Sequence, residues 1–218
     1  LSRVKEITGF SALTCMQQSI MNLGILMVQG LVNSFGTTIM AAFAAAVKID
    51  AFAYLPVQDF GNAFSIFTAQ NYGAKQTERI KKGIRAALTA SVAFSLMVSF
   101  CVFVFAEPLM TLFINAGETA VIEEGVRYLH IEGAFYFLIG ILFLFYGLYR
   151  ALAKPGMSVV LTIASLGIRV ALAYALSAIP AFGIAGIWWS VPIGWLLADV
   201  LGTVYYFVKR KSLLRGGL

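Results

Sequence analysis

The chain alternates between long apolar runs and short polar breaks. Apolar residues form six blocks, at about residues 11–34, 37–70, 84–106, 125–149, 157–179 and 184–208. A helix crosses the hydrocarbon core of a bilayer with about 20 residues, whereas a spanning strand alternates polar and apolar positions over about 10. The continuous runs predict an all-α, polytopic membrane protein, in which residues 1–218 form a single lobe of six transmembrane helices.

The second block is longer than one straight crossing requires and contains charged residues. Lys48, Asp50 and Asp59 lie inside it, which indicates that part of this helix faces a wet interior. Pro56 lacks a backbone N–H and clashes with the preceding turn, and Gly61 weakens the helix close by. We therefore expect a bend, and a candidate hinge, at Pro56 and Gly61.

Four amide side chains mark one face of the first block. Gln18, Asn22, Gln29 and Asn33 follow one another at steps of 4, 7 and 4 residues, which places them on one stripe of a helix. The stripe either lines a polar cavity or hydrogen-bonds neighbouring helices, and the spacing is compatible with both roles.

The charged residues inside the blocks are expected to face the protein interior, because a charge in lipid costs at least about 2.5 kcal/mol. By depth in the membrane, Lys48 is expected near Glu132, and Arg169 near Asp199. Each pair either locks helices together or serves transport. We expect Glu132, together with Lys48 and Asp50, to face a polar interior cavity, with Glu132 as a protonatable or cation-binding group.

Composition and charge agree with a membrane protein. The residues are 60% apolar and 12% charged, and the mean hydropathy is +0.86. Thirteen of the 16 Lys and Arg residues fall at one side of the predicted spans, so the positive-inside rule places both termini in the cytoplasm. The net charge of +6 is thus a topology signal, and no nucleic-acid partner is expected.

No pattern of an enzyme or a cofactor site stands out. Cys15 and Cys101 both lie in predicted spans, and His130 has no partners at metal-ligand spacing. The segment from Glu107 to Gly117 is too short to span and is expected to form a separate interfacial helix on the outer surface. The expected environment is the lipid bilayer of the cell inner (plasma) membrane.

A series of short motifs, in order along nearly the whole chain, resembles the multidrug and toxic compound extrusion (MATE) transporters. These motifs are Gln17-Gln18-Ser19, Val28-Gln29, Asn33-Ser34-Phe35-Gly36, Ala69-Gln70-Asn71-Tyr72-Gly73-Ala74, Glu107-Pro108-Leu109 and Arg150-Ala151-Leu152. The match is to the second half of the family's twelve-helix fold. The resemblance, and a first residue that is Leu rather than Met, suggest part of a longer protein whose N-terminal six-helix lobe faces this one across a cavity.

The resemblance implies a secondary antiporter that exports small organic, often cationic, substrates in exchange for Na⁺ or H⁺. Some members use an acidic residue of the seventh helix for the coupling cation, but this chain has Gln17, Gln18 and Ser19 there. Glu132 is the best acidic candidate that remains. The resemblance makes the polar cavity the expected site for substrate and ion, and the bend at Pro56 and Gly61 the expected gating hinge. Two alternatives stay open: a lipid-linked precursor flippase, which would use cationic residues such as Lys48 and Arg169, and a non-transporting membrane scaffold or fragment.

Overall fold

The computed structural model describes the backbone of residues 2–215, and helices account for nearly all of that range. No strand occurs in the described part, so the all-α prediction is confirmed. The helices are α1 (Ser2–Asn33), α2 (Thr37–Gly73), α3 (Thr77–Thr111), α4 (Thr119–Gly133), α5 (Tyr136–Ala151), α6 (Pro155–Thr162), the π-helical turn η1 (Ile163–Gly167), α7 (Ile168–Ser177) and α8 (Ile184–Arg215).

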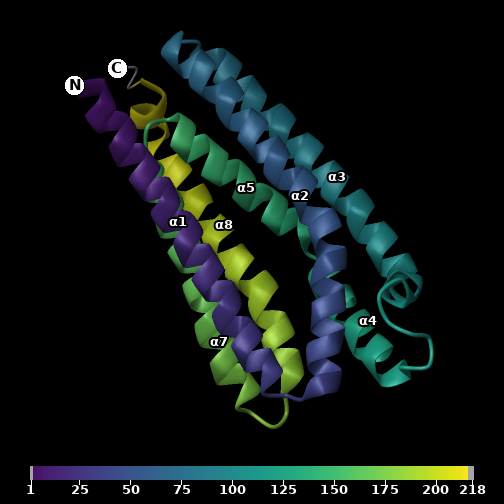
Figure 1. The fold of residues 1–218 in the computed structure, drawn as a ribbon. Coiled ribbons are helices and arrows are strands. Elements are labelled where there is room, and N and C mark those ends of the chain that lie inside the picture. Colours follow the sequence, from purple (N-terminus) through teal and green to yellow (C-terminus); the bar gives the residue numbers. More distant parts are fainter. Residues whose placement is uncertain (1, 216–218) are drawn as a thin grey trace.

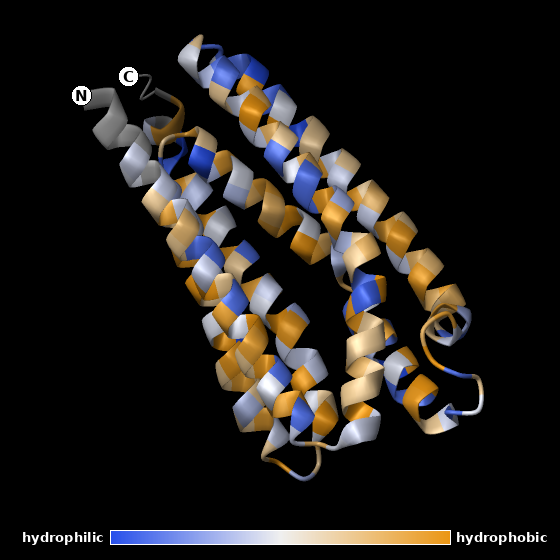
Figure 2. Cartoon of the chain, in the orientation of Figure 1, coloured by the Kyte–Doolittle hydropathy of each residue, from blue (hydrophilic) through white to orange (hydrophobic). Residues whose placement is uncertain are grey.

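In the part of the chain that the structure describes, four helices are long and apolar enough to cross a membrane: α2, α3, the continuous run Pro155–Ser177, and α8 over Ile184–Arg210. The pair α4 and α5 adds a fifth if its two bent parts count as one span. Helix α1 is not in this set, since its amide side chains dilute its apolar character. Figure 2 shows hydrophobic residues along much of α3, as a lipid-facing helix requires. The count of six spans stays a prediction.

Two interruptions were not foreseen. The fourth block begins earlier than expected, at Thr119, and breaks at Ala134 and Phe135, where α4 and α5 meet at 52°. The fifth block contains the turn η1. Helix α3 has non-helical dihedral angles at Phe105 (φ −107°, ψ 19°), so the helical segment from Glu107 to Thr111 is set off from the rest of α3 by a kink, at the place where a separate short helix was expected. Its place on the outer surface stays a prediction.

The helices form two groups joined by α5. Figure 1 shows α2 beside α3 in one group, α1, α7 and α8 in the other, and α5 between them. A small residue permits the close contact of α2 with α5: a Cβ atom at Gly61 would lie 2.9 Å from the backbone oxygen of Phe143. Small residues commonly allow helices to approach in this way within membranes. Gly61 is therefore a packing position, whatever its part in a hinge.

Helix α2 bends without losing its helical structure. Figure 1 shows a change of direction about halfway along it, and Pro56 lies close to the midpoint of its 37 residues. A small apolar pocket of about 250 Å³ adjoins Pro56 and is walled on the other side by Ala90 and Phe94 of α3. The bend agrees with the effect of a proline inside a helix.

Aromatic rings fill the core between α2, α4 and α8. Phe43 stacks on Trp188 with ring centres 5.5 Å apart, and the edge of Tyr128 meets Trp188 at 4.9 Å. The indole N–H of Trp188 donates a hydrogen bond of 2.7 Å to Glu124. Trp188 is thus fully buried rather than part of an outer aromatic belt, whereas Trp189 remains 42% exposed.

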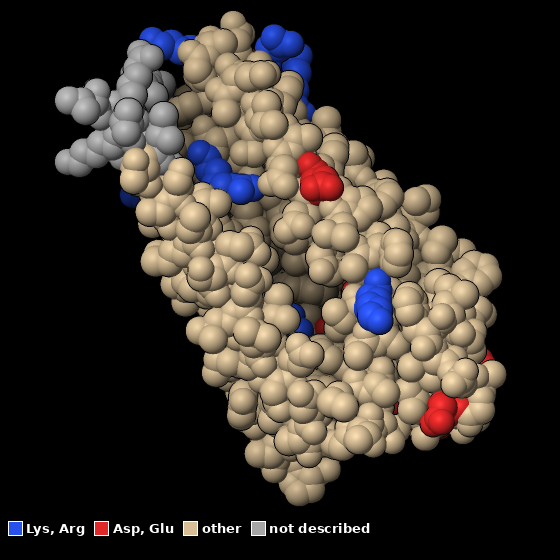
Figure 3. All heavy atoms as spheres, in the orientation of Figure 1, with Lys and Arg blue, Asp and Glu red and all other residues tan. Residues whose placement is uncertain are grey.

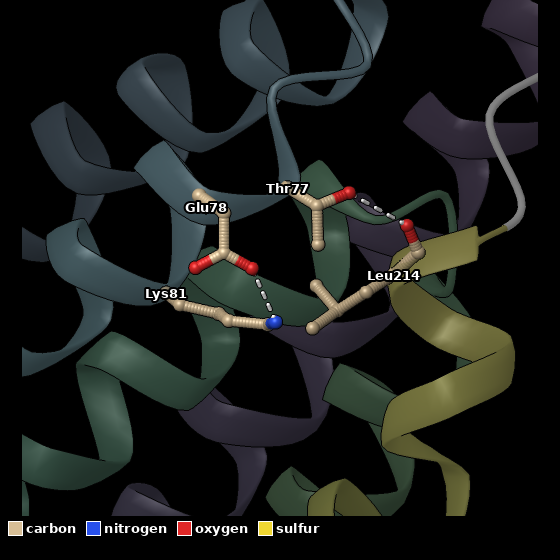
Figure 4. Close-up of polar contacts among 4 residues, drawn as sticks. All are labelled: Thr77, Glu78, Lys81 and Leu214. Carbon is tan, nitrogen blue, oxygen red and sulfur yellow. Dashed lines mark hydrogen bonds and ion pairs between the residues drawn. The ribbon is translucent and has the colours of Figure 1, made fainter.

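The start of α3 is attached to the end of α8. The Thr77 hydroxyl donates a hydrogen bond of 3.2 Å to the carbonyl of Leu214, and Lys81 pairs with Glu78 at 2.6 Å (Figure 4). Helix α1 begins and α8 ends at this same end of the lobe (Figure 1). Lys and Arg residues gather there in Figure 3, which matches the sidedness read from the sequence.

Candidate functional site

A cavity of about 540 Å³ opens between the two groups of helices. Figure 3 shows this hollow, with a few blue and red atoms inside a surface that is otherwise almost uncharged. Six of the seven residues predicted for a cavity line it: Gln18, Asn22, Gln29, Lys48, Asp50 and Glu132. Asn33 is exposed at the end of α1, outside the lining, and Asp59 is likewise exposed and outside it.

One buried polar group of the cavity is the carboxylate of Asp50 on α2. It is 4% exposed, and each of its oxygens accepts a hydrogen bond from a tyrosine. The Tyr128 hydroxyl donates to Oδ2 at 2.7 Å, and the Tyr136 hydroxyl donates to Oδ1. A carboxylate can be kept inside a membrane protein at moderate cost when both oxygens are bonded in this way.

Glu132 on α4 lies beside Asp50. Its side chain is 3% exposed, and its Oε1 atom has no hydrogen-bond partner. The Glu132 carboxyl group interacts with the carboxyl group of Asp50 and with the hydroxyl group of Tyr128. Two buried carboxyl groups at such close range repel one another when both are charged. The pair Asp50–Glu132 is therefore suited to bind a proton or a metal cation between its oxygens.

Arg169 on α7 faces this carboxyl pair across the cavity. It is half-buried, its Nε atom has no hydrogen-bond partner, and its charge interacts with both Asp50 and Glu132. The expected pairing of Arg169 with Asp199 was wrong. Arg169 is level with Gly194 of α8, where an added Cβ would lie 3.3 Å from its Cβ, and Asp199 is five residues, or about 7.5 Å, further along.

The expected pairing of Lys48 with Glu132 was also wrong. Lys48 is exposed, and its ammonium lies 5.5 Å from the centre of the Phe113 ring. Asp50 follows Lys48 by two residues, which is about 200° around a helix, so one side chain points into the lobe and the other toward the opening. Among the side chains that the structure describes, the two ion pairs that form are Lys81–Glu78 and Arg127–Glu124.

The sequence interpretation missed Tyr128, Tyr136 and the cavity position of Arg169. Tyr128 precedes Glu132 by four residues, a spacing that puts both on one helix face and could have revealed it. Tyr136 follows the break between α4 and α5 and reaches Asp50 only because of that bend. No periodic pattern in the sequence indicates that Tyr136 contacts Asp50.

Comparison with known proteins agrees with these features. The MatE family model matches residues 13–175. The probable multidrug resistance protein YoeA of Bacillus subtilis is 28% identical over 199 residues, which are 90% of this chain and 42% of that protein. A FAD transporter of Shewanella oneidensis is 27% identical over 173 residues, or 78% of this chain and 37% of that protein. The chain thus spans less than half the length of the curated relatives it matches.

Solved structures show the same fold. A crystal structure of MATE in complex with MaL6 superposes with a TM-score of 0.89 and 19% identity, and covers 96% of this chain and 47% of that one. The described helices therefore have the architecture of one lobe of such a transporter. With the family match over residues 13–175, this shows that the chain belongs to the MATE family of multidrug transporters.

Proposed function

We propose that this chain is the C-terminal half of a cation-coupled secondary antiporter, which exports small organic molecules in exchange for Na⁺ or H⁺. The observation that carries the proposal is the buried carboxyl pair Asp50–Glu132 at the wall of an open cavity. The functional unit would include an N-terminal six-helix lobe that closes the other side of the cavity. The protein would lie in the inner (plasma) membrane, and both termini of this half would be in the cytoplasm.

The cavity has the composition of a transport site. The amide side chains of Gln18, Asn22 and Gln29 on α1 line one wall. Aromatic and aliphatic residues of α2, α4 and α5 line much of the rest, and η1, α7 and α8 contribute Leu166, Arg169 and Trp195. A few polar groups in an apolar pocket are typical of sites for small organic molecules. The carboxyl pair adjoins this space, so that an ion bound there would alter the electrostatic potential felt by a substrate.

The helix interruptions support alternating access. The bend of α2, the break between α4 and α5 and the turn η1 all occur in elements that wall the cavity. Discontinuous helices around a central site are a recurring feature of secondary transporters, and π-helical turns often mark functional positions. These interruptions supply places where one part of the lobe can rotate against another.

The test is transport by the complete protein that contains this chain, reconstituted in liposomes with an imposed Na⁺ or proton gradient. Ethidium and carboxyfluorescein serve as probes. Glu132→Gln is expected to preserve folding and yield but to lower gradient-driven transport by about tenfold or more, because an amide cannot bind a proton or replace a carboxylate ligand. Glu123→Gln, an exposed position on the same helix, is the matched control.

The outcome against the proposal is also defined. If Glu132→Gln and Asp50→Asn both transport at the wild-type rate, with unchanged pH and Na⁺ dependence, the coupling group lies elsewhere. If no gradient drives transport in the wild-type protein, the chain is not a cation-coupled antiporter.

A further inference from the structure

The charges of the cavity are separated by depth. Both acidic residues, Asp50 and Glu132, are 4% exposed or less. Both basic residues are more accessible, since Lys48 is exposed and Arg169 is half-buried. All four residues are among those that line the cavity. A molecule that enters the cavity therefore meets positive charge before it meets negative charge.

Hydrogen bonds within the protein also occupy the acidic groups. Both oxygens of Asp50 are occupied by the hydroxyls of Tyr128 and Tyr136, and Glu132 lies against Asp50. These contacts give each oxygen of Asp50 a hydroxyl donor, so a cationic substrate would compete with the two tyrosines for that carboxylate.

The basic groups have unused capacity to bind. Within the described part of the chain neither Lys48 nor Arg169 forms an ion pair, and the ammonium of Lys48 lies over the Phe113 ring. The Nε–H of Arg169 has no acceptor. A guanidinium offers five N–H donors and an ammonium three, and both bind carboxylate and phosphate oxygens well, the more so in a low-dielectric site.

We propose that the cavity binds an organic anion, a small molecule whose carboxylate or phosphate group is held by Lys48 on α2 and Arg169 on α7. The amides of Gln18, Asn22 and Gln29 on α1 would bind its neutral polar atoms. The inference rests on the proposed function for the role of this anion as the transported substrate. Binding itself can be measured without any transport.

The test compares two dyes that share a xanthene core and differ in charge: carboxyfluorescein, an anion, and the methyl ester of tetramethylrhodamine, a cation. Their dissociation constants are measured by fluorescence polarisation on the complete purified protein. Lys48→Gln and Arg169→Gln are each expected to weaken carboxyfluorescein binding by about tenfold, since each removes a charged hydrogen-bond donor. Binding of the cationic dye should stay the same or strengthen.

Matched variants control for charge and folding. Lys81→Gln makes the same substitution at a position outside the cavity and should leave both constants unchanged. Lys48→Arg and Arg169→Lys keep the charge and should bind carboxyfluorescein within about threefold of the wild type. These two variants keep the proposal testable if Arg169→Gln fails to fold.

Competition for carboxyfluorescein binding then distinguishes a soluble organic anion from a lipid-linked one. Displacement of carboxyfluorescein by phenyl phosphate indicates a soluble anion, and displacement by farnesyl phosphate alone indicates a lipid-linked one. The proposal is overturned if carboxyfluorescein and both phosphates fail to bind, or if the glutamine variants weaken the two dyes equally. Since these are equilibrium measurements, they can succeed even if Glu132→Gln shows that the carboxyl pair does not couple transport.

Discussion

The hydroxyl of Tyr128 on α4 donates a hydrogen bond of 2.7 Å to the carboxylate of Asp50 on α2, across 78 residues of sequence. This contact and the second one, from Tyr136, connect α2, which bends, to the pair α4 and α5, which is broken between the two helices. It also fixes the position of Glu132, one turn beyond Tyr128. The carboxyl pair is thus held by α2 and α4 together, and a movement of either helix changes its geometry.

Replacing Tyr128 with Phe should weaken the lobe and disturb ion binding. The change leaves one buried oxygen of Asp50 without a donor, at a cost of about 1–3 kcal/mol. We expect a lower apparent Tm in a thermal-shift assay and an altered Na⁺ or pH dependence of transport. Tyr174→Phe, at an exposed tyrosine of α7, is the control. An unchanged Tm for Tyr128→Phe would mean that water replaces the lost donor.

Gly61→Ala should destabilise the contact between α2 and α5. The added Cβ would lie 2.9 Å from the backbone oxygen of Phe143, and backbone atoms cannot move aside as a flexible side chain can. Overpacking of this kind costs about 1–3 kcal/mol. Gly73→Ala, in the same helix with open space around it, should leave the apparent Tm unchanged or raise it slightly. Equal Tm values for the two variants would contradict the packing role of Gly61.

Pro56→Ala should slow transport while preserving substrate binding. Alanine restores a backbone N–H to the middle of α2 and favours a straighter helix. We expect the transport rate to fall by several-fold and the dissociation constant of a bound dye to stay within about threefold. Pro192→Ala in α8 tests whether the loss is specific to α2. Transport by Pro56→Ala at the wild-type rate would remove this residue from the gating mechanism.

Asp199→Asn should raise the stability of the protein. Asp199 is 6% exposed, and neither of its carboxylate oxygens has a hydrogen-bond partner in the described part of the chain. A buried carboxylate without partners costs several kcal/mol, and a neutral amide of the same shape avoids most of that cost. We expect the apparent Tm at neutral pH to increase by a few degrees. Asp59→Asn, at an exposed position, should have little effect; a lower Tm for Asp199→Asn would indicate that the carboxyl group has a partner.

Cysteine labelling can test the orientation of the lobe. In a background without Cys15 and Cys101, a cysteine at Lys75 should react with an impermeant maleimide only after the cytoplasmic side is exposed, because this turn carries much of the basic charge. A cysteine at Phe182, in the turn between α7 and α8 at the opposite end, should react from outside. Labelling of Lys75→Cys in intact cells would reverse the assigned orientation.

The sequence by itself determined the helical class and the face of α1 that carries Gln18, Asn22 and Gln29. These properties follow from apolar run length and from the 3.6-residue period, which act within one helix. The MATE resemblance rested on short motifs in the same order, and the family match confirms it. The sidedness of the basic residues was also readable, since it needs only a count at helix ends.

Only the tertiary structure decided which charges meet. Depth along a helix placed Lys48 near Glu132 and Arg169 near Asp199, yet neither pair forms. Depth fixes one coordinate, whereas contact also requires that two side chains point toward each other, and that direction depends on helix rotation, on the bend of α2 and on the break before Tyr136. These depend on packing between helices, such as Gly61 against Phe143, which no single segment of sequence encodes.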